Sequence, residues 1–248
     1  MKALILAAGL GTRLMPLTES IPKALLKLNG TTLLEIAIRK LASEGFNEII
    51  VNVHHHAGQV IEFLSKNPFK DLKIAISDET EELLDTGGAI LKARWFLDGE
   101  KPFAVHNVDI ISNISFHKLL ADHLEKGSLA TLSVMDRQTK RYFLFDETLR
   151  LNGWTDTSTG EIQWAGEEPP FAINLAFSGI HIISPEIFSL MNESGKFSII
   201  GTYLKLAATH PIYGSKQESI TWFDLGKPEQ IEAVSAFLKE NPDFIPAL

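Results

Sequence analysis

The residues with the clearest chemical potential lie close to the N-terminus. Gly9 and Gly11 follow an apolar run, and Arg13 comes two residues after the second glycine. Glycine has no Cβ, so the backbone N–H groups of such a loop can turn towards an anion. A guanidinium pairs well with phosphate oxygens. The pattern is compatible with a phosphate-binding loop, but two glycines at this spacing by themselves more often indicate a tight turn.

Two familiar phosphate-binding motifs are excluded by the residues that follow the glycines. A Walker loop needs Gly-Lys-Ser or Gly-Lys-Thr at its end, whereas Thr12 and Arg13 follow Gly11. The dinucleotide-binding fingerprint needs a third glycine at the position that Leu14 occupies. A bound anion would therefore be held in a different way.

A second glycine pair lies at the start of an expected helix. Thr86 can cap this helix, and Gly87 and Gly88 allow a flat ligand to approach the backbone closely. A plain helix start explains the same residues and is the simpler interpretation when they are taken alone.

Two aspartates, more than a hundred residues apart, each end an apolar segment. Asp109 follows a buried strand, and ligands of open α/β sheets bind where such strands end. Asp224 ends another apolar strand near the C-terminus. Carboxylates brought together at a sheet edge suit Mg²⁺, a hard cation that prefers oxygen ligands and bridges to phosphates. Taken singly, each aspartate is equally typical of a turn or a helix cap.

The whole N-terminal string, LAAGLGTRLMPLT followed by IPKALL, resembles the signature of the sugar-1-phosphate nucleotidylyltransferase family. The segments around Thr86, Asp109 and Asp224 resemble further family motifs. The chain departs from the family pattern at Ala24, where a proline is common, and at Val108, where a glycine is common.

The resemblance implies a role for each matching residue. The glycine-rich loop would wrap the triphosphate, while Arg13 and Lys23 neutralise charge as pyrophosphate leaves. Asp109 and Asp224 would be the Mg²⁺ ligands, and Asn174 or Ser178 would contact the sugar. The implied nucleotide-binding residues are Leu6, Ala8, Gly9, Gly11, Thr12, Arg13, Gly87 and Gly88.

The implied activity is transfer of a nucleotidyl group from a nucleoside triphosphate to a sugar 1-phosphate, which gives a nucleotide sugar and pyrophosphate. The short length and the segment Thr86–Gly88 favour UTP with N-acetylmuramate 1-phosphate, or with a related hexose 1-phosphate. GTP with mannose 1-phosphate is the alternative pair.

Two other classes of protein are weighed against this enzyme. A sensor of nucleotides or sugar phosphates would keep the fold without turnover, and Val108 is the residue that favours it. It would not need both Asp109 and Asp224. A hydride-transferring enzyme is disfavoured because the third glycine of its fingerprint is absent.

The first half of the chain alternates between strand and helix patterns. Strands are expected at residues 3–8, 48–53, 73–76 and 102–108, and helices at about 33–44, 59–64, 88–96 and 115–126. Thr32 and Glu35 form a capping box, and Gly45 is a helix-ending glycine. This order predicts an α/β fold with a Rossmann-like, mostly parallel sheet flanked by helices.

The second half predicts an antiparallel hairpin insertion, so that the expected fold is GT-A-like. Short strands are expected at 129–134, 142–145, 149–154, 162–164, 177–183 and 220–224, with helices opening at Pro185 and Pro228. No linker or repeat interrupts residues 1–248, which are expected to form one catalytic domain.

Composition limits the possible partners. The 248 residues carry a net charge of −8, which argues against nucleic-acid or anionic-membrane surfaces but allows a few converging cations to bind nucleotides. Cysteine is absent, so a thiolate nucleophile or cysteine-based metal site is excluded. No apolar stretch is long enough for a membrane span. We expect a cytoplasmic monomer or small homo-oligomer.

Overall fold

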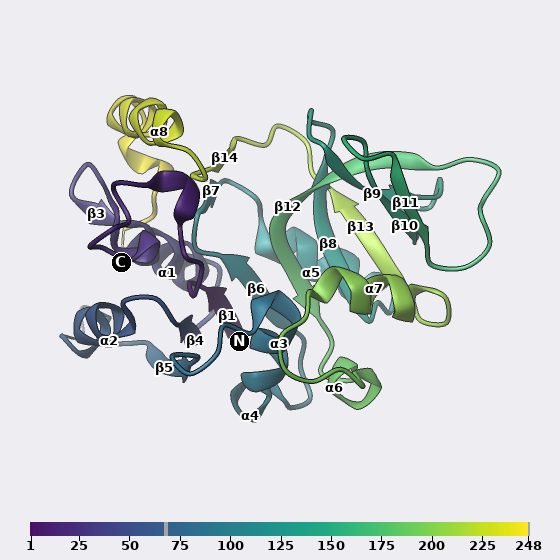
Figure 1. The fold of residues 1–248 in the computed structure, drawn as a ribbon, viewed down its shortest axis with the longest axis horizontal. Coiled ribbons are helices and arrows are strands. Elements are labelled where there is room, and N and C mark those ends of the chain that lie inside the picture. Colours follow the sequence, from purple (N-terminus) through teal and green to yellow (C-terminus); the bar gives the residue numbers. More distant parts are fainter. Residues whose placement is uncertain (67–68, 248) are drawn as a thin grey trace.

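The alternating first half builds the parallel part of a large twisted sheet (Figure 1). The computed structural model describes residues 1–66 and 69–247. The parallel strands are β1 (Lys2–Leu6), β4 (Glu48–Val53), β5 (Lys73–Asp78) and β6 (Phe103–Asn107). The helices between and after them are α1 (Leu33–Ser43), α2 (Ala57–Ser65), α3 (Asp85–Lys92), α4 (Arg94–Leu97) and α5 (Phe116–Glu125).

The second half extends this sheet with strands that are antiparallel, except that β13 pairs with β8 in parallel. The order across the sheet is β11-β10-β9-β12-β6-β1-β4-β5, and β8 and β13 continue from β12. The added strands are β8 (Ala130–Met135), β9 (Arg141–Phe145), β10 (Leu151–Asp156), β11 (Glu161–Trp164), β12 (Ile173–Ile183) and β13 (Ile212–Lys216). The predicted α/β fold with an antiparallel hairpin insertion is confirmed.

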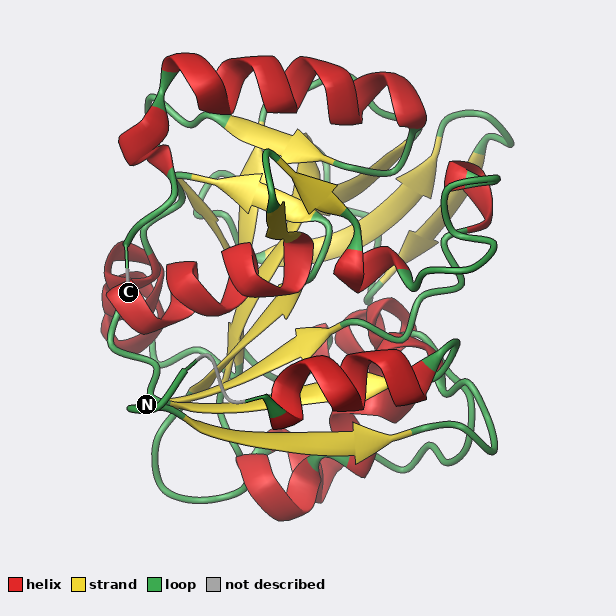
Figure 2. Cartoon of the chain, turned by 90° about the vertical axis from the view of Figure 1, so that its left-hand side faces the viewer, coloured by secondary structure: helices red, strands yellow, loops and turns green. Residues whose placement is uncertain are grey.

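Helices lie on both sides of the parallel strands (Figure 2). Successive side chains of β1 point to opposite faces, so Ala3 and Ile5 join one apolar cluster and Leu4 joins the other. The first cluster includes residues of α1, α2, α5 and α8 (Pro228–Glu240). The second includes residues of α3, α4, α6 (Ile187–Leu190) and α7 (Ile199–Ala207). Burial on both faces explains the uninterrupted apolar sequence of β1.

Two small sheets stand apart from the large one. β2 (Lys27–Leu28) pairs with β3 (Thr31–Thr32), and β7 (Ile110–Ser112) pairs with β14 (Trp222–Asp224). Asp224 is thus held by β7 rather than by the edge of the main sheet. The short 3₁₀ helices are Thr12–Leu14, Lys23–Leu25 and Pro242–Phe244. α7 and β13 were not predicted from the sequence.

The predicted ends of α1 are largely confirmed. The Thr32 hydroxyl accepts a hydrogen bond from the Glu35 amide at 3.1 Å, and Gly45 adopts a φ of +84° just after the helix. The Glu35 carboxylate, however, pairs with Arg39 along the helix instead of returning to Thr32. Only half of the predicted capping box therefore forms.

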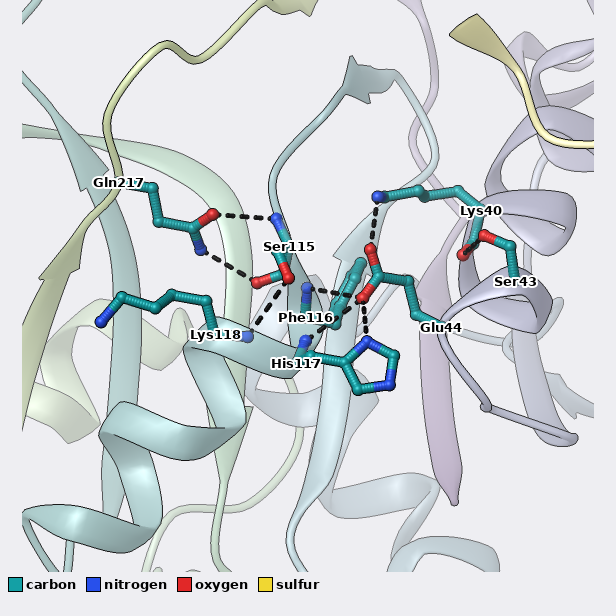
Figure 3. A network of polar contacts seen from close by, with 8 residues as sticks. All are labelled: Lys40, Ser43, Glu44, Ser115, Phe116, His117, Lys118 and Gln217. Carbon is teal, nitrogen blue, oxygen red and sulfur yellow. Dashed lines mark hydrogen bonds and ion pairs between the residues drawn. The ribbon is translucent and has the colours of Figure 1, made fainter. Parts of the chain in front are cut away.

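The end of α1 is tied to the start of α5 by one carboxylate (Figure 3). Glu44 accepts hydrogen bonds from the amides of Phe116 and His117 at 3.1 and 3.2 Å, and from Lys40 at 2.6 Å. Ser115 caps α5 conventionally, since its hydroxyl accepts from the Lys118 amide. Glu44 thus supplies a second cap from another helix, where negative charge is favourable.

Within the described residues, no helix combines the length and the apolar character that crossing a bilayer requires.

Candidate active site

A cavity of about 460 Å³ opens at the carboxyl ends of the parallel strands. Leu6 of β1, Asn52 of β4 and Asn107 of β6 line it, together with Glu79 just after β5. Of the predicted site residues, the following line this cavity: Leu6, Ala8, Gly9, Gly11, Thr12, Arg13, Lys23 and Asp109. This is the edge of an open α/β sheet at which ligands characteristically bind.

The two glycines of the glycine-rich loop are explained in different ways. Gly11 has a φ of +63°, and a Cβ there would lie 2.9 Å from the Thr18 side chain, so the fold itself requires this glycine. A Cβ on Gly9 would meet nothing within 4 Å, so packing does not account for it. In the part of the chain described, the amides of residues 9–11 donate to no protein acceptor. Open space and free N–H groups together suit close approach of an anion.

A buried amide–carboxylate pair, not predicted from the sequence, supports the beginning of this loop. The Asn52 side-chain oxygen accepts from the amides of Ala7 at 2.6 Å and Ala8 at 3.3 Å. The Asn52 amide donates at 2.8 Å to Glu79, whose other oxygen accepts from the Leu84 amide at 3.2 Å. Burial raises the pKa of Glu79, while its hydrogen bonds oppose this shift. The pair links the glycine-rich loop to the segment before α3.

Packing explains why the second pair of residues, Gly87 and Gly88, are glycines. Gly87 and Gly88 do not line the cavity, and both of their amides donate to the Phe197 carbonyl. A Cβ on Gly88 would lie under 3.0 Å from the Gly195 carbonyl oxygen. Close packing of α3 against residues 195–199 therefore accounts for both glycines, and their place beside a bound base stays a prediction.

Their neighbours form this wall of the cavity instead. Asp85, Thr86 and Lys196 line it. Asp85 holds a φ of +59°, an unusual conformation for a residue with a side chain. The Thr86 hydroxyl accepts from the Ile199 amide at 3.0 Å, so it joins α3 to α7 and does not cap α3 as predicted. Sequence reasoning missed Lys196 because residues around it carried no recognisable motif.

The predicted carboxylates are brought together by the small sheet. Asp224 faces Ile110 in the β7–β14 pair, and the Leu225 amide donates to the Asp109 carbonyl at 2.9 Å. Lys23 forms an ion pair with the Asp109 carboxylate. Burial and the Asp109 charge raise the pKa of Asp224 above its ordinary value, although nearby cations oppose the rise. These cations are Lys23, Arg13 and Arg137.

This donor set fits a divalent cation. Asp109 and Asp224 offer oxygen ligands, and burial together with the Asp109 charge raises the pKa of Asp224. Within residues 1–66 and 69–247, no group of three or more acidic, histidine or cysteine side chains surrounds one point. Two carboxylates suffice for Mg²⁺ when phosphate oxygens and water complete its octahedron.

Val108, the departure that favoured a sensor, is compatible with the local backbone. It is not among the described residues with positive φ, its side chain is buried, and its amide donates to the Leu6 carbonyl at 3.1 Å. A glycine is therefore not required here, and Asp109 keeps its place on the cavity wall.

The two predicted sugar contacts lie elsewhere. Ser178 is fully buried, and its hydroxyl donates to the Ser133 carbonyl at 2.9 Å, so it is not free to bind a ligand. Asn174 is exposed on β12 and pairs with Leu144 of β9. Neither residue lines the cavity.

The cavity lies at the carboxyl ends of parallel strands and is lined by a glycine-rich loop whose amides are free. These two features define the class of nucleotide-binding α/β proteins. Comparison with known proteins gives the family. The chain belongs to the nucleotidyl transferase family, whose pattern it matches over residues 2–241.

Relatives of known function agree with this assignment. The chain is 33% identical to the N-acetylmuramate alpha-1-phosphate uridylyltransferase of Caulobacter vibrioides, and the match covers 96% of this chain and 97% of that protein. It is 30% identical to mannose-1-phosphate guanylyltransferase 1 of Arabidopsis thaliana over 92% of this chain and 62% of that protein.

Solved structures show the same fold. HddC from Yersinia pseudotuberculosis, in complex with GMP-PN, superimposes with a TM-score of 0.76 and 24% identity, covering 96% of this chain and 99% of that one. A UDP-glucose pyrophosphorylase bound to UDP-glucose gives a TM-score of 0.78 at 18% identity, covering 97% and 98%. The predicted enzyme class, a sugar-phosphate nucleotidylyltransferase, is confirmed by the family and its relatives.

Proposed function

We propose that the chain transfers a uridylyl group from UTP to N-acetylmuramate 1-phosphate or a closely related hexose 1-phosphate. The observation that carries this choice is the correspondence over nearly the full length of both chains with the Caulobacter uridylyltransferase. A second such uridylyltransferase, from Neisseria meningitidis, is 29% identical and is covered to 93%. We propose further that residues 1–248 act as one catalytic domain in the cytoplasm, where nucleoside triphosphates are made.

The residues of the cavity support an in-line displacement. An oxygen of the sugar phosphate attacks the α-phosphorus of UTP, the bond from that phosphorus to the bridging oxygen breaks, and pyrophosphate leaves. The attacking group is already an anion, so no side chain has to remove a proton. What the protein must do is hold two polyanions together and neutralise their charge.

Each part of the site has a task in this scheme. The free amides of residues 9–11 bind the triphosphate, and Arg13 and Lys23 neutralise the charge that develops on pyrophosphate. Asn52 and Glu79 hold the loop in the shape that presents these amides. Asp109 and Asp224 would hold Mg²⁺, which supplies further charge neutralisation at the phosphates.

The nucleobase is assigned to the opposite wall of the cavity. Asp85, Thr86 and Lys196 surround this end with polar groups. These replace Gly87 and Gly88 as the residues we propose to recognise the base.

GTP with mannose 1-phosphate is the second candidate pair. Mannose-1-phosphate guanylyltransferases match 92% or more of this chain, and the one from Arabidopsis reaches 30% identity. The chain covers only 62% of that protein, which is why we rank this pair second.

The test is pyrophosphate release in Mg²⁺ with five triphosphates (UTP, GTP, CTP, ATP and dTTP), each crossed against a panel of sugar 1-phosphates. We expect release only when UTP and N-acetylmuramate 1-phosphate, or a near relative, are both present. Release with GTP and mannose 1-phosphate would replace the proposed pair. Triphosphate binding without release across the panel would favour the sensor.

A further inference from the structure

β12 contains an irregularity beside the two carboxylates. Its register with β8 shifts between Phe177 and His181, and Gly179 within the shift has a φ of +80°. A Cβ on Gly179 would lie 2.9 Å from the side chain of Asn107, which lines the cavity. The bulge therefore brings β12 directly against the end of β6.

Two side chains use the carbonyl groups that this bulge releases from the ladder. The Trp222 indole N–H donates to the Ser178 carbonyl at 2.9 Å. Arg137, from the connection between β8 and β9, donates through Nη2 to the Phe177 carbonyl at 3.0 Å. The Arg137 guanidinium also stacks on the Trp222 ring, 4.3 Å from its centroid. A stacked and tethered guanidinium is fixed in orientation.

Most of the hydrogen-bonding capacity of Arg137 remains unused. A guanidinium has five N–H donors, and among the described residues only the bond to Phe177 is formed. Its Nε is buried without any acceptor. No carboxylate of the described chain lies within ion-pair distance of Arg137. A buried charged donor without an acceptor is unfavourable, and an anion beside the guanidinium would supply that acceptor.

Arg137 lies close to Asp224, but it belongs to another part of the fold than the loop cations. The ring on which it stacks is that of Trp222, two residues before Asp224 on the same strand. Lys23 and Arg13 belong to the N-terminal segment and line the cavity, whereas Arg137 belongs to the antiparallel half and does not line it. Positive charge near the Asp109–Asp224 pair is thus supplied by both halves of the chain.

We propose that Arg137 binds the phosphate of the sugar 1-phosphate, with its unused N–H groups directed at the phosphate oxygens. The proposal rests on nucleotidyl transfer as the reaction. The glycine-rich loop, Arg13 and Lys23 serve the triphosphate on one side of the carboxylates. An acceptor that attacks in line must approach the α-phosphorus from the side opposite the leaving pyrophosphate, and Arg137 supplies the cation there.

The phosphate is common to every sugar 1-phosphate, so the test does not depend on the proposed sugar. Initial rates are measured with whichever triphosphate and acceptor the substrate panel identifies. We expect Arg137→Gln to raise the KM of the acceptor about 10- to 100-fold, while the KM of the triphosphate changes less than about twofold. Arg137→Lys, which keeps the charge but loses the planar fork, is expected to fall between wild type and Arg137→Gln.

Matched variants separate binding from structure. Lys140→Gln removes an exposed positive charge from the same connection and is expected to leave both KM values unchanged. Trp222→Phe keeps an aromatic ring under the guanidinium but loses the bond to Ser178, so a smaller rise in acceptor KM is expected. Circular dichroism and thermal melting show whether each variant is folded; if Arg137→Gln is not, Arg137→Lys carries the test.

The possible results divide clearly. A selective rise in acceptor KM supports the proposal. Equal changes in the KM of acceptor and triphosphate, or no change in either, overturn the proposal. Arg137 would then only stabilise the β12 bulge. If no pair in the panel reacts, the proposed substrates fail first, and binding of glucose 1-phosphate to wild type and Arg137→Gln is compared by thermal shift. Equal binding, or no binding to wild type, then counts against Arg137 as well.

Discussion

Asp109 contacts both the cation Lys23 and the segment that carries Asp224. Its carboxylate pairs with Lys23, and its carbonyl accepts from the Leu225 amide next to Asp224. A substitution therefore removes an oxygen ligand and leaves Lys23 without its anion. Arrangements of this kind act mainly through the charge they stabilise in the transition state.

Asp109→Ala is expected to lower kcat by at least about 10²-fold, because a proposed ligand of the divalent cation is lost. The side chain lies on the cavity wall, so the fold should persist. Pyrophosphate release measures the first effect, and far-UV circular dichroism the second. A variant that is folded and retains most of its activity would remove Asp109 from the cation site.

Lys23→Ala is expected to raise the KM of the triphosphate about tenfold, because a nearly buried ammonium beside the phosphate-binding loop is lost. Steady-state kinetics with the triphosphate varied at saturating acceptor provide the measurement. Lys27→Ala, at an exposed position a few residues later, is the control. Unchanged kinetics in Lys23→Ala would contradict a role for Lys23 at the triphosphate.

At the scale of elements, the site depends on contacts that hold helices against one another. Glu44 joins α1 to α5, and the glycines at the start of α3 let it pack against residues 195–199. The residues of the first contact do not line the cavity, whereas the second contact adjoins Thr86 and Lys196, which do. Both contacts fix a helix against a distant segment of the chain.

Glu44→Gln is expected to destabilise the protein by about 1–2 kcal/mol near neutral pH. Burial raises the pKa of Glu44, but Lys40 and His117 outweigh it, so the pKa lies below its ordinary value of 4.5. A carboxylate with a lowered folded pKa contributes stability above its unfolded pKa and loses it as pH falls through the folded pKa. The difference between wild type and variant should therefore shrink below about pH 4.5.

Urea denaturation at several pH values provides this comparison. Glu62→Gln is the control: it loses only an exposed ion pair with Lys66 on α2 and should change stability much less than Glu44→Gln does. A Glu44→Gln effect that does not vary with pH would argue against the carboxylate charge as the stabilising feature.

Gly88→Ala is expected to destabilise the protein by about 1–3 kcal/mol, because the new methyl group would overlap the Gly195 carbonyl oxygen. Gly58→Ala is the matched control: it lies in α2, and its Cβ would meet nothing within 4 Å. That change should stabilise slightly, since alanine favours a helix. Thermal melting distinguishes the two, and equal effects would contradict the packing role of Gly88.

At the scale of the whole molecule, the cavity gathers segments from distant parts of the chain. The cavity is lined by the N-terminal loop, by strand ends from β4 and β6, and by Lys196 before α7. A triphosphate bound there would contact all of these segments at once. Its effect on stability is therefore global.

UTP with Mg²⁺ at about 100 times its dissociation constant should add about 2.7 kcal/mol of stability. For a chain of this length, that corresponds to a rise in melting temperature of about 5–10 °C. Differential scanning fluorimetry with each triphosphate measures the shift. A larger shift with GTP than with UTP would favour the second substrate pair.

Local sequence was enough to predict the glycine-rich loop, the parallel half of the sheet and the hairpin strands. Each depends on a short-range property of the sequence. These properties are apolar runs of strand length, helix caps such as Thr32, and a glycine at position 11, where φ is positive. The family resemblance added Lys23, Asp109 and Asp224, because its motifs are contiguous.

The remaining features depend on contacts between segments far apart in the chain, for which a single sequence carries no periodic signal. Gly87 and Gly88 pack against residues 195–199, more than a hundred residues further along the chain. The Ser178 hydroxyl donates to the carbonyl of Ser133, on a neighbouring strand. Asn52, Glu79 and Arg137 are ordinary polar residues in the sequence. Folding buries their polar atoms beside particular donors and acceptors. Because a buried polar atom without a hydrogen-bond partner is costly, burial decides which of these residues matter to the site.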